Sequence, residues 1–250
     1  MLKVSVITAT YNRSATVVRA LSSIKSQTYT NIQVVVVDGA SKDNTISLVS
    51  PMLDDKDILQ SEPDFGIYDA LNKGLALADG EILAFLHSDD LYFDNNVISR
   101  VVETFSDDSV DVVYGDVCFF SGSNVMKTRR RYRSDKLSER NLAWGKMPAH
   151  PATFIRRRVY QKIGYFETDF SIAADYEFMC RVVHYTNLKS VHLSKELVRM
   201  QLGGISTSGF RSTILLNKEV CRAIRKNGIY TNMFMLLSKY PSKILQFLNR

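Results

Sequence analysis

The sequence predicts an α/β protein with a mostly parallel sheet that carries helices on both faces. Short apolar runs alternate with amphipathic helical segments over the first hundred residues, at the spacing of strand–helix–strand units. The runs at 32–37 and 81–86 are apolar at nearly every position, as expected for strands buried on both faces. These observations predict parallel strands joined by right-handed helical crossovers.

The individual elements follow from these runs and from the polar residues between them. The expected strands are 4–9, 32–37, 58–59 and 81–86, then 112–114, 117–120 and 190–197 beyond a less regular region. The expected helices are 14–26, 68–78 and 174–184, with a short helix that Asp43 or Asn44 can cap.

Composition limits the class of protein. A chain of 250 residues with 45% hydrophobic and 23% charged residues can bury a substantial core, in one large domain or one domain with an appendage. Cys118, Cys180 and Cys221 lie far apart, which predicts buried free thiols in a reducing compartment. No segment has a signal-peptide core or approaches the ~20 apolar residues of a membrane-spanning helix. We therefore expect a cytoplasmic protein.

The net charge of +6 and the pI near 9.1 favour an anionic partner. Basic residues gather at 129–133 and at 156–158, where a solvated surface is the simpler explanation. No helix-turn-helix, zinc finger or aromatic RNA-binding strand accompanies them, so we predict no nucleic-acid partner.

Acidic residues follow two of the predicted strands. Asp38 ends the run at 32–37, and Asp89 and Asp90 come after the run at 81–86. The carboxyl ends of strands are where open α/β sheets bind ligands. Two adjacent carboxylates repel each other, and a hard divalent cation would let both stay ionised. The pair therefore predicts a metal–diphosphate site, against the alternative of a helix N-cap and first turn.

Other nucleotide motifs are absent. No GxGxxG follows the first strand, which argues against a nicotinamide cofactor, and no GxxxxGK[ST] motif of a P-loop NTPase occurs. A tight turn at Asp38-Gly39 is the alternative to a nucleotide contact, but it does not explain why polar residues recur at successive strand ends.

Four segments together resemble glycosyltransferase family 2, with the likeness strongest to bacterial enzymes of exopolysaccharide, colanic-acid and O-antigen assembly. They are Thr8–Arg13, Val37–Thr45, Asp64–Gly74 and Leu86–Asp90. The resemblance covers roughly residues 2–210 and implies the GT-A fold. It implies a Rossmann-like nucleotide-sugar half at 1–110, a smaller acceptor-binding half at 111–210 and a C-terminal helical extension at 211–250.

The resemblance also assigns roles to the strand-end residues. Thr8, Tyr11 and Asp38 match positions that hold the nucleoside, with Tyr11 near the base and Asp38 on the base or ribose. Asp89 and Asp90 match the acidic motif that meets the nucleotide and the metal. Asp90 is the expected direct ligand of Mn²⁺ or Mg²⁺ on the diphosphate.

Two positions depart from the family pattern. His87 stands where many members have an aspartate, which changes the acidic cluster around the metal. Leu71 stands where many members have an arginine, so Asp69 and Lys73 are expected to contribute nucleotide contacts instead.

The second half contains the expected base. Residues 173–181 resemble the family motif in which an aspartate deprotonates the acceptor hydroxyl, and Asp175 fills that position. Its alternative role is the N-cap of a helix. A base and a metal on opposite sides of the anomeric carbon imply a single displacement with inversion.

Three weaker segments complete the prediction. Trp144 and His150 match the acceptor side of the family, and 203–207 matches a loop that closes over the diphosphate. Residues 230–250 read as a basic amphipathic helix interrupted at Pro241, able to lie on an anionic membrane at its inner face. Packing on its own domain or on a second subunit is the alternative.

The sequence thus predicts an inverting, metal-dependent hexosyltransferase of bacterial surface polysaccharide synthesis. It would move a sugar from a nucleotide sugar, with UDP expected before GDP or dTDP, to a saccharide or polyprenol-linked acceptor. A nucleotidyltransferase and a catalytically silent nucleotide-binding or assembly protein are the alternatives. His87 and Leu71 favour the silent protein. It is opposed by the presence of all four expected aspartates, Asp38, Asp89, Asp90 and Asp175.

Overall fold

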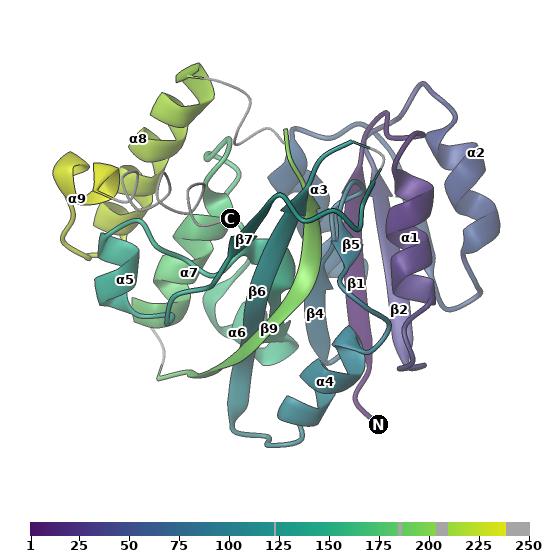
Figure 1. The fold of residues 1–250 in the computed structure, drawn as a ribbon, viewed down its shortest axis with the longest axis horizontal. Coiled ribbons are helices and arrows are strands. Elements are labelled where there is room, and N and C mark those ends of the chain that lie inside the picture. Colours follow the sequence, from purple (N-terminus) through teal and green to yellow (C-terminus); the bar gives the residue numbers. More distant parts are fainter. Residues whose placement is uncertain (123, 185–186, 204–209, 239–250) are drawn as a thin grey trace.

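The computed structural model describes residues 1–122, 124–184, 187–203 and 210–238, which form one sheet between helical layers (Figure 1). The strands are β1 Val4–Thr10, β2 Ile32–Asp38, β3 Ile58–Ser61, β4 Ile82–Phe85, β5 Leu91–Tyr92, β6 Val110–Phe120, β7 Arg130–Tyr132, β8 Thr153–Arg156 and β9 Lys189–Gln201. The helices are α1 Val17–Lys25, α2 Thr45–Val49, α3 Ile67–Leu77, α4 Val97–Thr104, α5 Glu139–Ala143, α6 Arg157–Ile163, α7 Ala174–His184, α8 Phe210–Lys226 and α9 Met233–Leu237. Two 3₁₀ turns, Ser50–Met52 and His150–Ala152, complete the described elements.

The strand order is β3-β2-β1-β4-β8-β6-β9-β5, and β7 pairs with β6 beside this path. β1 lies parallel to both β2 and β4, and β2 lies parallel to β3. The register pairs Thr10 with Asp38 and Ile7 with Phe85, so the carboxyl ends of these strands meet at one edge. Because the chain proceeds from β1 to β2 on one side and reaches β4 on the other, this edge is a topological switch point, where such sheets bind ligands.

The central strands are buried on both faces, which explains their continuous apolar runs. Val35 and Val37 of β2 point into one hydrophobic cluster, while Val34 and Val36 point into the other. The first cluster contains residues of α3, α6, α7 and α8, and the second contains residues of α1 and α4. The α/β prediction, with helices on both faces of a mostly parallel sheet, is therefore confirmed (Figure 1).

The structure corrects several expected boundaries. The two strands expected at 112–114 and 117–120 are one strand, β6, because Gly115 does not break it. A Cβ on Gly115 would lie 2.6 Å from Cδ1 of Leu197, so the glycine lets β9 approach closely. The first helix begins at Val17 rather than at residue 14, and Asn44 takes the N-cap position of α2 without a side-chain hydrogen bond.

The predictions for cysteines and for the tail have different outcomes. Cys118, Cys180 and Cys221 are buried free thiols, as predicted. Leu236 of α9 packs into the same core cluster as α7, so this part of the tail lies on its own domain. The rest of the predicted tail helix, with Pro241, lies outside the described residues, as do positions 204–207 of the predicted loop. Among the helices described here, none is both long and apolar enough to cross a membrane.

Gly74 determines how closely α3 approaches the sheet, and its replacement by valine is expected to destabilise the protein by about 1–3 kcal/mol. A Cβ at this position would clash with Cγ2 of Ile7 in β1 and lie 3.4 Å from Cγ2 of Val37 in β2. Ala76→Val on the exposed face of the same helix is the control. Denaturant unfolding of both variants tests this expectation, and equal losses of stability would contradict it.

Candidate active site

The loops after β1 and β2 are joined by hydrogen bonds. Asn12 N donates to Ser41 Oγ at 2.8 Å, and Lys42 N donates to Asn12 Oδ1 at 2.8 Å. Asn12 and Ala40 adopt positive φ values of 50° and 61°, which L residues rarely adopt. The carboxyl edge of the sheet is thus preorganised at some cost in backbone strain, a pattern that clusters at functional sites.

Asp38 is fully buried at the end of β2. Its carboxylate accepts hydrogen bonds from Ser41 N at 2.8 Å and from Ser61 Oγ at 2.7 Å, and Ser41 Oγ donates to it as well. Thr8, also buried, has a hydroxyl without a partner in the described part of the chain. Asp38 therefore organises the loop after β2, and its contact with a nucleoside stays a prediction.

Tyr11 and Asp64 converge above Gly39. The ring of Tyr11 is 54% exposed, and a Cβ on Gly39 would lie 3.4 Å from Cδ2 of Tyr11 and 2.5 Å from Asp64 Oδ2. Only a glycine leaves the backbone open there, and an exposed ring beside open backbone suits stacking of a planar base. Asp64 was not singled out from the sequence, although it follows a short predicted strand in the way Asp38 does.

Asp69 and Lys73 brace the loop that carries Asp64. Lys73 Nζ lies 2.8 Å from Glu62 Oε1 and 3.3 Å from Asp69 Oδ2, and it donates to Pro63 O at 2.9 Å. Leu71, by contrast, is buried in the core and offers no polar group. Direct contact of Asp69 or Lys73 with a nucleotide stays a prediction.

The acidic pair follows β4 on a turn in which Asp90 N donates to His87 O at 3.0 Å. Asp90 is only 3% exposed, and its Oδ1 accepts a hydrogen bond from Gln201 N at 3.0 Å. Burial, and next the charge of Asp89, raise the pKa of Asp90 well above its usual value. Within the described chain, no Lys or Arg nitrogen lies within 4.0 Å of this carboxylate.

These residues fit a divalent cation that is shared with a ligand. Among the residues with a described position, no three His, Cys, Asp or Glu side chains converge to hold a metal alone. A buried carboxylate with no paired cation within 4.0 Å is costly, even though the more distant charge of Arg19 lowers the pKa of Asp90, and Asp89 and Asp90 offer hard oxygen ligands. A cation bound there would have open coordination positions for phosphate oxygens.

A wall of rings connects this turn to the second half of the molecule. His150 stacks on Phe85 with 4.7 Å between ring centroids, and it lies 6.2 Å from His87 and 5.5 Å from Phe166. Phe166 in turn lies 5.8 Å from the ring of Tyr68. Side chains far apart in sequence therefore form one continuous, largely buried cluster of rings.

Both histidines of this wall have pKa values below the ordinary one, which favours their neutral forms at pH 7. Burial lowers the pKa of His87 against the opposing charge of Asp89. Burial, and next the neighbouring His87, lower the pKa of His150 to about 3. His150 Nε2 has no hydrogen-bond partner in the described chain, so this nitrogen could bond to a polar group of a ligand. Trp144 is the C-cap of α5, with 38% of its surface exposed, and it makes no ring contact with this wall in the described chain.

Asp175 lies at the far end of this wall. Its Oδ1 accepts a hydrogen bond from Tyr68 hydroxyl at 3.1 Å and from Tyr176 N at 2.8 Å. Burial raises the pKa of Asp175 to about 6. The N-cap alternative is wrong, because α7 begins at Ala174 and Asp175 lies inside its first turn.

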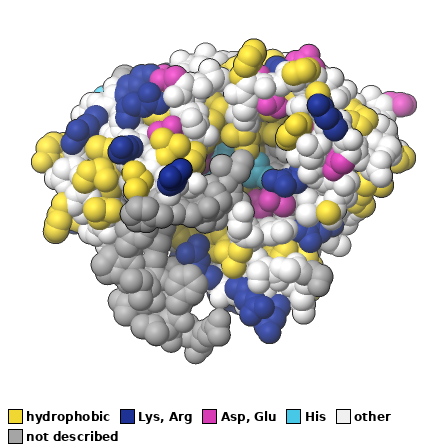
Figure 2. All heavy atoms as spheres, turned by 90° about the horizontal axis from the view of Figure 1, so that it is seen from above, with side chains coloured by type: hydrophobic (Ala, Val, Ile, Leu, Met, Phe, Trp, Pro, Cys, Tyr) yellow, Lys and Arg dark blue, Asp and Glu magenta, His cyan; other side chains and the backbone are white. Residues whose placement is uncertain are grey.

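Viewed onto the carboxyl edge of the sheet, the molecule shows histidine side chains close to acidic and basic ones near the middle of the face (Figure 2).

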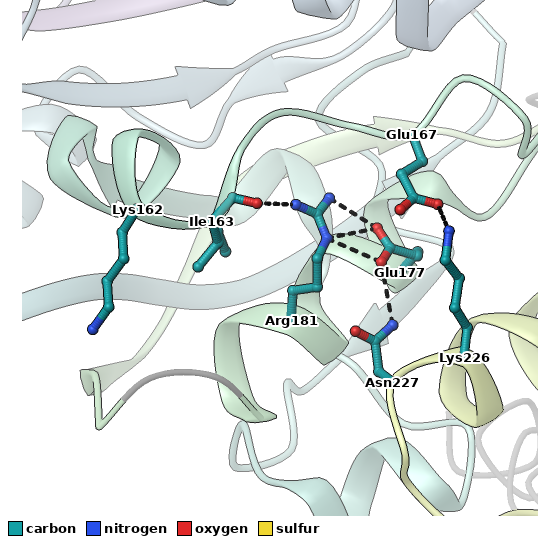
Figure 3. A pocket seen from close by; sticks show the side chains of 7 residues that line it. All are labelled: Lys162, Ile163, Glu167, Glu177, Arg181, Lys226 and Asn227. Carbon is teal, nitrogen blue, oxygen red and sulfur yellow. Dashed lines mark hydrogen bonds and ion pairs between the residues drawn. The ribbon is translucent and has the colours of Figure 1, made fainter.

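A separate cavity of about 430 Å³ is lined by none of the predicted site residues (Figure 3). It is lined by Lys162, Ile163, Glu167, Glu177, Arg181, Lys226 and Asn227.

Comparison with solved structures defines the fold. The chain resembles Staphylococcus aureus TarS 1–349 in complex with UDP, with a TM-score of 0.68 and 22% identity over 100% of this chain and 71% of that one. It also resembles the mannosyltransferase PcManGT from Pyrobaculum calidifontis, in complex with GDP-Man and Mn²⁺, with a TM-score of 0.67 and 21% identity over 92% of this chain and 65% of that one. These likenesses show that the chain has a fold of the GT-A type.

The sequence comparisons assign the family. The model of Glycosyl transferase family 2 matches residues 5–164, and the chain belongs to this family. An uncharacterized glycosyltransferase of Mycobacterium tuberculosis is 35% identical over 181 residues, which are 71% of this chain and 68% of that protein. A PGL/p-HBAD biosynthesis glycosyltransferase of the same species is 31% identical over the same shares of the two chains.

Proposed function

We propose that this glycosyltransferase is an inverting, metal-dependent hexosyltransferase that uses a UDP-sugar. We further propose that it acts on a saccharide or polyprenol-linked acceptor in bacterial surface polysaccharide synthesis. The observation that carries the mechanism is the wall of rings, which has the turn before Asp89 and Asp90 at one end and Asp175 at the other. The proposed cation site and base thus lie at opposite ends of this wall, which keeps them apart as a single displacement requires.

Asp175 is the proposed base. A sugar hydroxyl is a weak nucleophile, and a carboxylate within hydrogen-bond reach accepts its proton as the attack develops. A pKa of about 6 leaves Asp175 mostly ionised at pH 7, yet basic enough to accept a proton. Tyr68 hydroxyl orients this carboxylate from α3.

The donor would occupy the carboxyl edge of the sheet. Tyr11, Thr8 and Asp38 would hold the nucleoside, and Asp90 with Asp89 would hold Mn²⁺ or Mg²⁺ against the diphosphate. A bound divalent cation supplies neutralisation of the charge that grows on the departing nucleoside diphosphate. The named ligands of similar structures, UDP, UDP-GlcNAc and GDP-Man, support a nucleotide-sugar donor.

The remaining parts of the proposal concern the acceptor and the location in the cell. Residues 1–110 would bind the donor and 111–210 the acceptor, with His150 and Trp144 on the acceptor side. A relative named for PGL/p-HBAD biosynthesis supports an acceptor in the cell envelope. A location in the cytoplasm, at the inner face of the membrane, suits such an acceptor, and the exposed Tyr230 and Phe234 suit peripheral contact.

Calorimetric titration with UDP, GDP and dTDP, each with and without Mn²⁺, tests the donor site. We expect UDP to bind, and its affinity to fall at least tenfold without Mn²⁺. In Tyr11→Ala the affinity should fall about 5–150-fold, because a base-stacking ring worth about 1–3 kcal/mol is lost. Leu48→Ala, another half-exposed hydrophobic residue, is the matched control.

A product assay separates the alternative functions. The proposed enzyme releases nucleoside diphosphate from a nucleotide sugar. Release of pyrophosphate from a nucleoside triphosphate would identify a nucleotidyltransferase instead. Nucleotide binding without turnover of any UDP-, GDP- or dTDP-sugar would favour the silent protein.

A further inference from the structure

The loop between α6 and α7 ends next to the helix that carries Asp175. Residues 164–173 have no regular secondary structure, so their backbone groups need partners from other elements. Any movement of this loop would displace the first turn of α7 and the proposed base with it. What holds the loop therefore determines where Asp175 lies.

One face of α8 holds the first part of this loop. Arg222 donates from Nη2 to Asp169 O at 2.8 Å, and its guanidinium carbon lies 3.8 Å from the ring centroid of Phe170. One turn further along α8, Lys226 pairs with Glu167. Positions 222 and 226 share a helix face with position 219, because their spacings are three and four residues.

Glu219 holds the last part of the loop. Its Oε1 accepts a hydrogen bond from Ser171 N at 2.9 Å, and its Oε2 accepts from Ile172 N at 2.9 Å and Ala173 N at 3.0 Å. The side chain is only 7% exposed, so these amides replace the water that the carboxylate has lost. One carboxylate thus fixes three consecutive residues directly before α7.

The loop is held from the opposite side as well. Tyr68 hydroxyl donates to Ile172 O at 2.6 Å and to Asp175 Oδ1 at 3.1 Å. Ile172 therefore lies between Tyr68 of α3 and Glu219 of α8, and the same tyrosine orients the proposed base. Loss of either contact would leave the segment fixed on one side only.

α8 is firmly attached to α7. Arg181 Nε donates to both oxygens of Glu177 at 2.9 Å, and Asn227 Nδ2 donates to Glu177 Oε1 at 3.2 Å (Figure 3). Arg181 and Glu177 both lie in α7, so Asn227, directly after α8, is the polar link between the two helices here. Val220, Ala223 and Ile224 of α8 pack into the same buried cluster as α7. Glu219 therefore lies on a helix that is packed against α7.

We propose that Glu219 is the positioning residue for Asp175, and that α8, which follows the family-matched residues 5–164, thereby completes the active site. This inference rests on the proposed role of Asp175 as the base. Glu219 contacts the loop before α7, so its effect on transfer would pass through the geometry and charge around Asp175.

The groups facing Asp175 predict the direction of the electrostatic effect. Burial raises the pKa of Asp175, the amide of Tyr176 and the hydroxyl of Tyr68 lower it, and the charge of Glu219 raises it. Removal of that charge should therefore lower the pKa of Asp175. This shift reports the charge of Glu219 near Asp175, whereas hydrogen exchange of residues 171–173 reports its hold on the loop.

Glu219→Gln is the main test variant. Its carboxamide oxygen can still accept, but its NH₂ group would face one of the three amides and repel it. We expect the amides of 171–173 to lose protection from hydrogen exchange, while those of α8 keep theirs. We also expect the carbon-13 NMR titration of Asp175 to shift to lower pH. For nucleotide-sugar turnover, kcat should fall about 10–100-fold with an unchanged donor KM.

Two further variants complete the design. Glu139→Gln is the matched control, because Glu139 also bonds to α7, through His184 Nδ1 at 2.9 Å, but away from the loop. It should leave hydrogen exchange, the titration of Asp175, kcat and the donor KM unchanged. Glu219→Asp keeps the charge and retracts it by one methylene. The amides of 171–173 should therefore lose protection, while the titration of Asp175 should shift less than in Glu219→Gln. This variant also provides the test if Glu219→Gln does not fold.

The outcomes separate this inference from the proposed function. Unchanged exchange at 171–173 and an unchanged titration of Asp175 in Glu219→Gln would overturn the inference, even if the enzyme turns over its donor. Wild-type protein without turnover of any nucleotide sugar would overturn the proposed function, whereas the exchange and titration would still show whether Glu219 positions Asp175.

Discussion

Replacement of Asp175 by asparagine is expected to lower the rate of sugar transfer by about 10²–10⁴-fold, the usual contribution of a general base. Asparagine has nearly the same shape, and its oxygen can still accept the hydrogen bond from Tyr68 hydroxyl. It cannot accept a proton from the acceptor. Affinity for the nucleotide should stay unchanged, because the predicted nucleotide contacts lie on β1, β2 and the turn after β4.

The same substitution should stabilise the folded protein at pH 8. Burial raises the pKa of Asp175 from its ordinary value of 3.8 to about 6, so the folded state binds this proton more tightly than the unfolded state. Such a group favours folding most at low pH, and its contribution is lost as the pH rises from about 4 to about 6. Above that range the ionised Asp175 costs the folded state about 3 kcal/mol, at 1.36 kcal/mol per pKa unit.

Calorimetric melting of wild type and Asp175→Asn at pH 4 and pH 8, with transfer assays at pH 8, measures both effects. The Tm difference should be several degrees at pH 8 and small at pH 4, and Asp55→Asn on an exposed loop should show neither effect. An active or a less stable Asp175→Asn protein at pH 8 would show that this carboxylate is not a buried base.

The sequence alone predicts the positions of those candidate site residues that follow directly from the direction of a strand. A parallel strand that is apolar on both faces has a defined carboxyl end, so Asp38, Asp89 and Asp90 were expected at one edge of the sheet, and the structure places them there. The departure at Leu71 was also visible, and its side chain indeed lies in the core.

Contacts between distant segments were not predictable. β8 runs antiparallel between β4 and β6, and Gly115 continues β6 because Leu197 covers it from β9. His150 is buried because it stacks on Phe85, which is visible only in three dimensions. Glu219 meets the amide of Ser171 across 48 residues, and no local pattern marks that pairing.

Asp90→Asn is expected to have opposite effects on stability and on metal response. Burial, and next the charge of Asp89, raise the pKa of Asp90 well above its usual value. Protonated Asp90 therefore favours the folded state, and this stabilisation is lost as the pH rises through the pKa of Asp90 in the folded protein. Asparagine removes the charge, and its oxygen can still accept the hydrogen bond from Gln201 N. Without metal, Asp90→Asn should therefore melt at a higher temperature than wild type at pH 8.

Mn²⁺ should reverse that order. A ligand that binds only the folded state stabilises it by RT ln(1 + [L]/Kd), about 2.7 kcal/mol at a concentration of 100 Kd. With UDP present, Mn²⁺ should raise the Tm of wild type by several degrees and leave Asp90→Asn unchanged, with Asp55→Asn as the control that responds like wild type. An ionised, buried carboxylate with no Lys or Arg of the described chain within 4.0 Å is costly, so binding of the cation would offset the stability that the charge of Asp90 costs. Equal Mn²⁺ responses in wild type and Asp90→Asn would mean that other groups hold the metal.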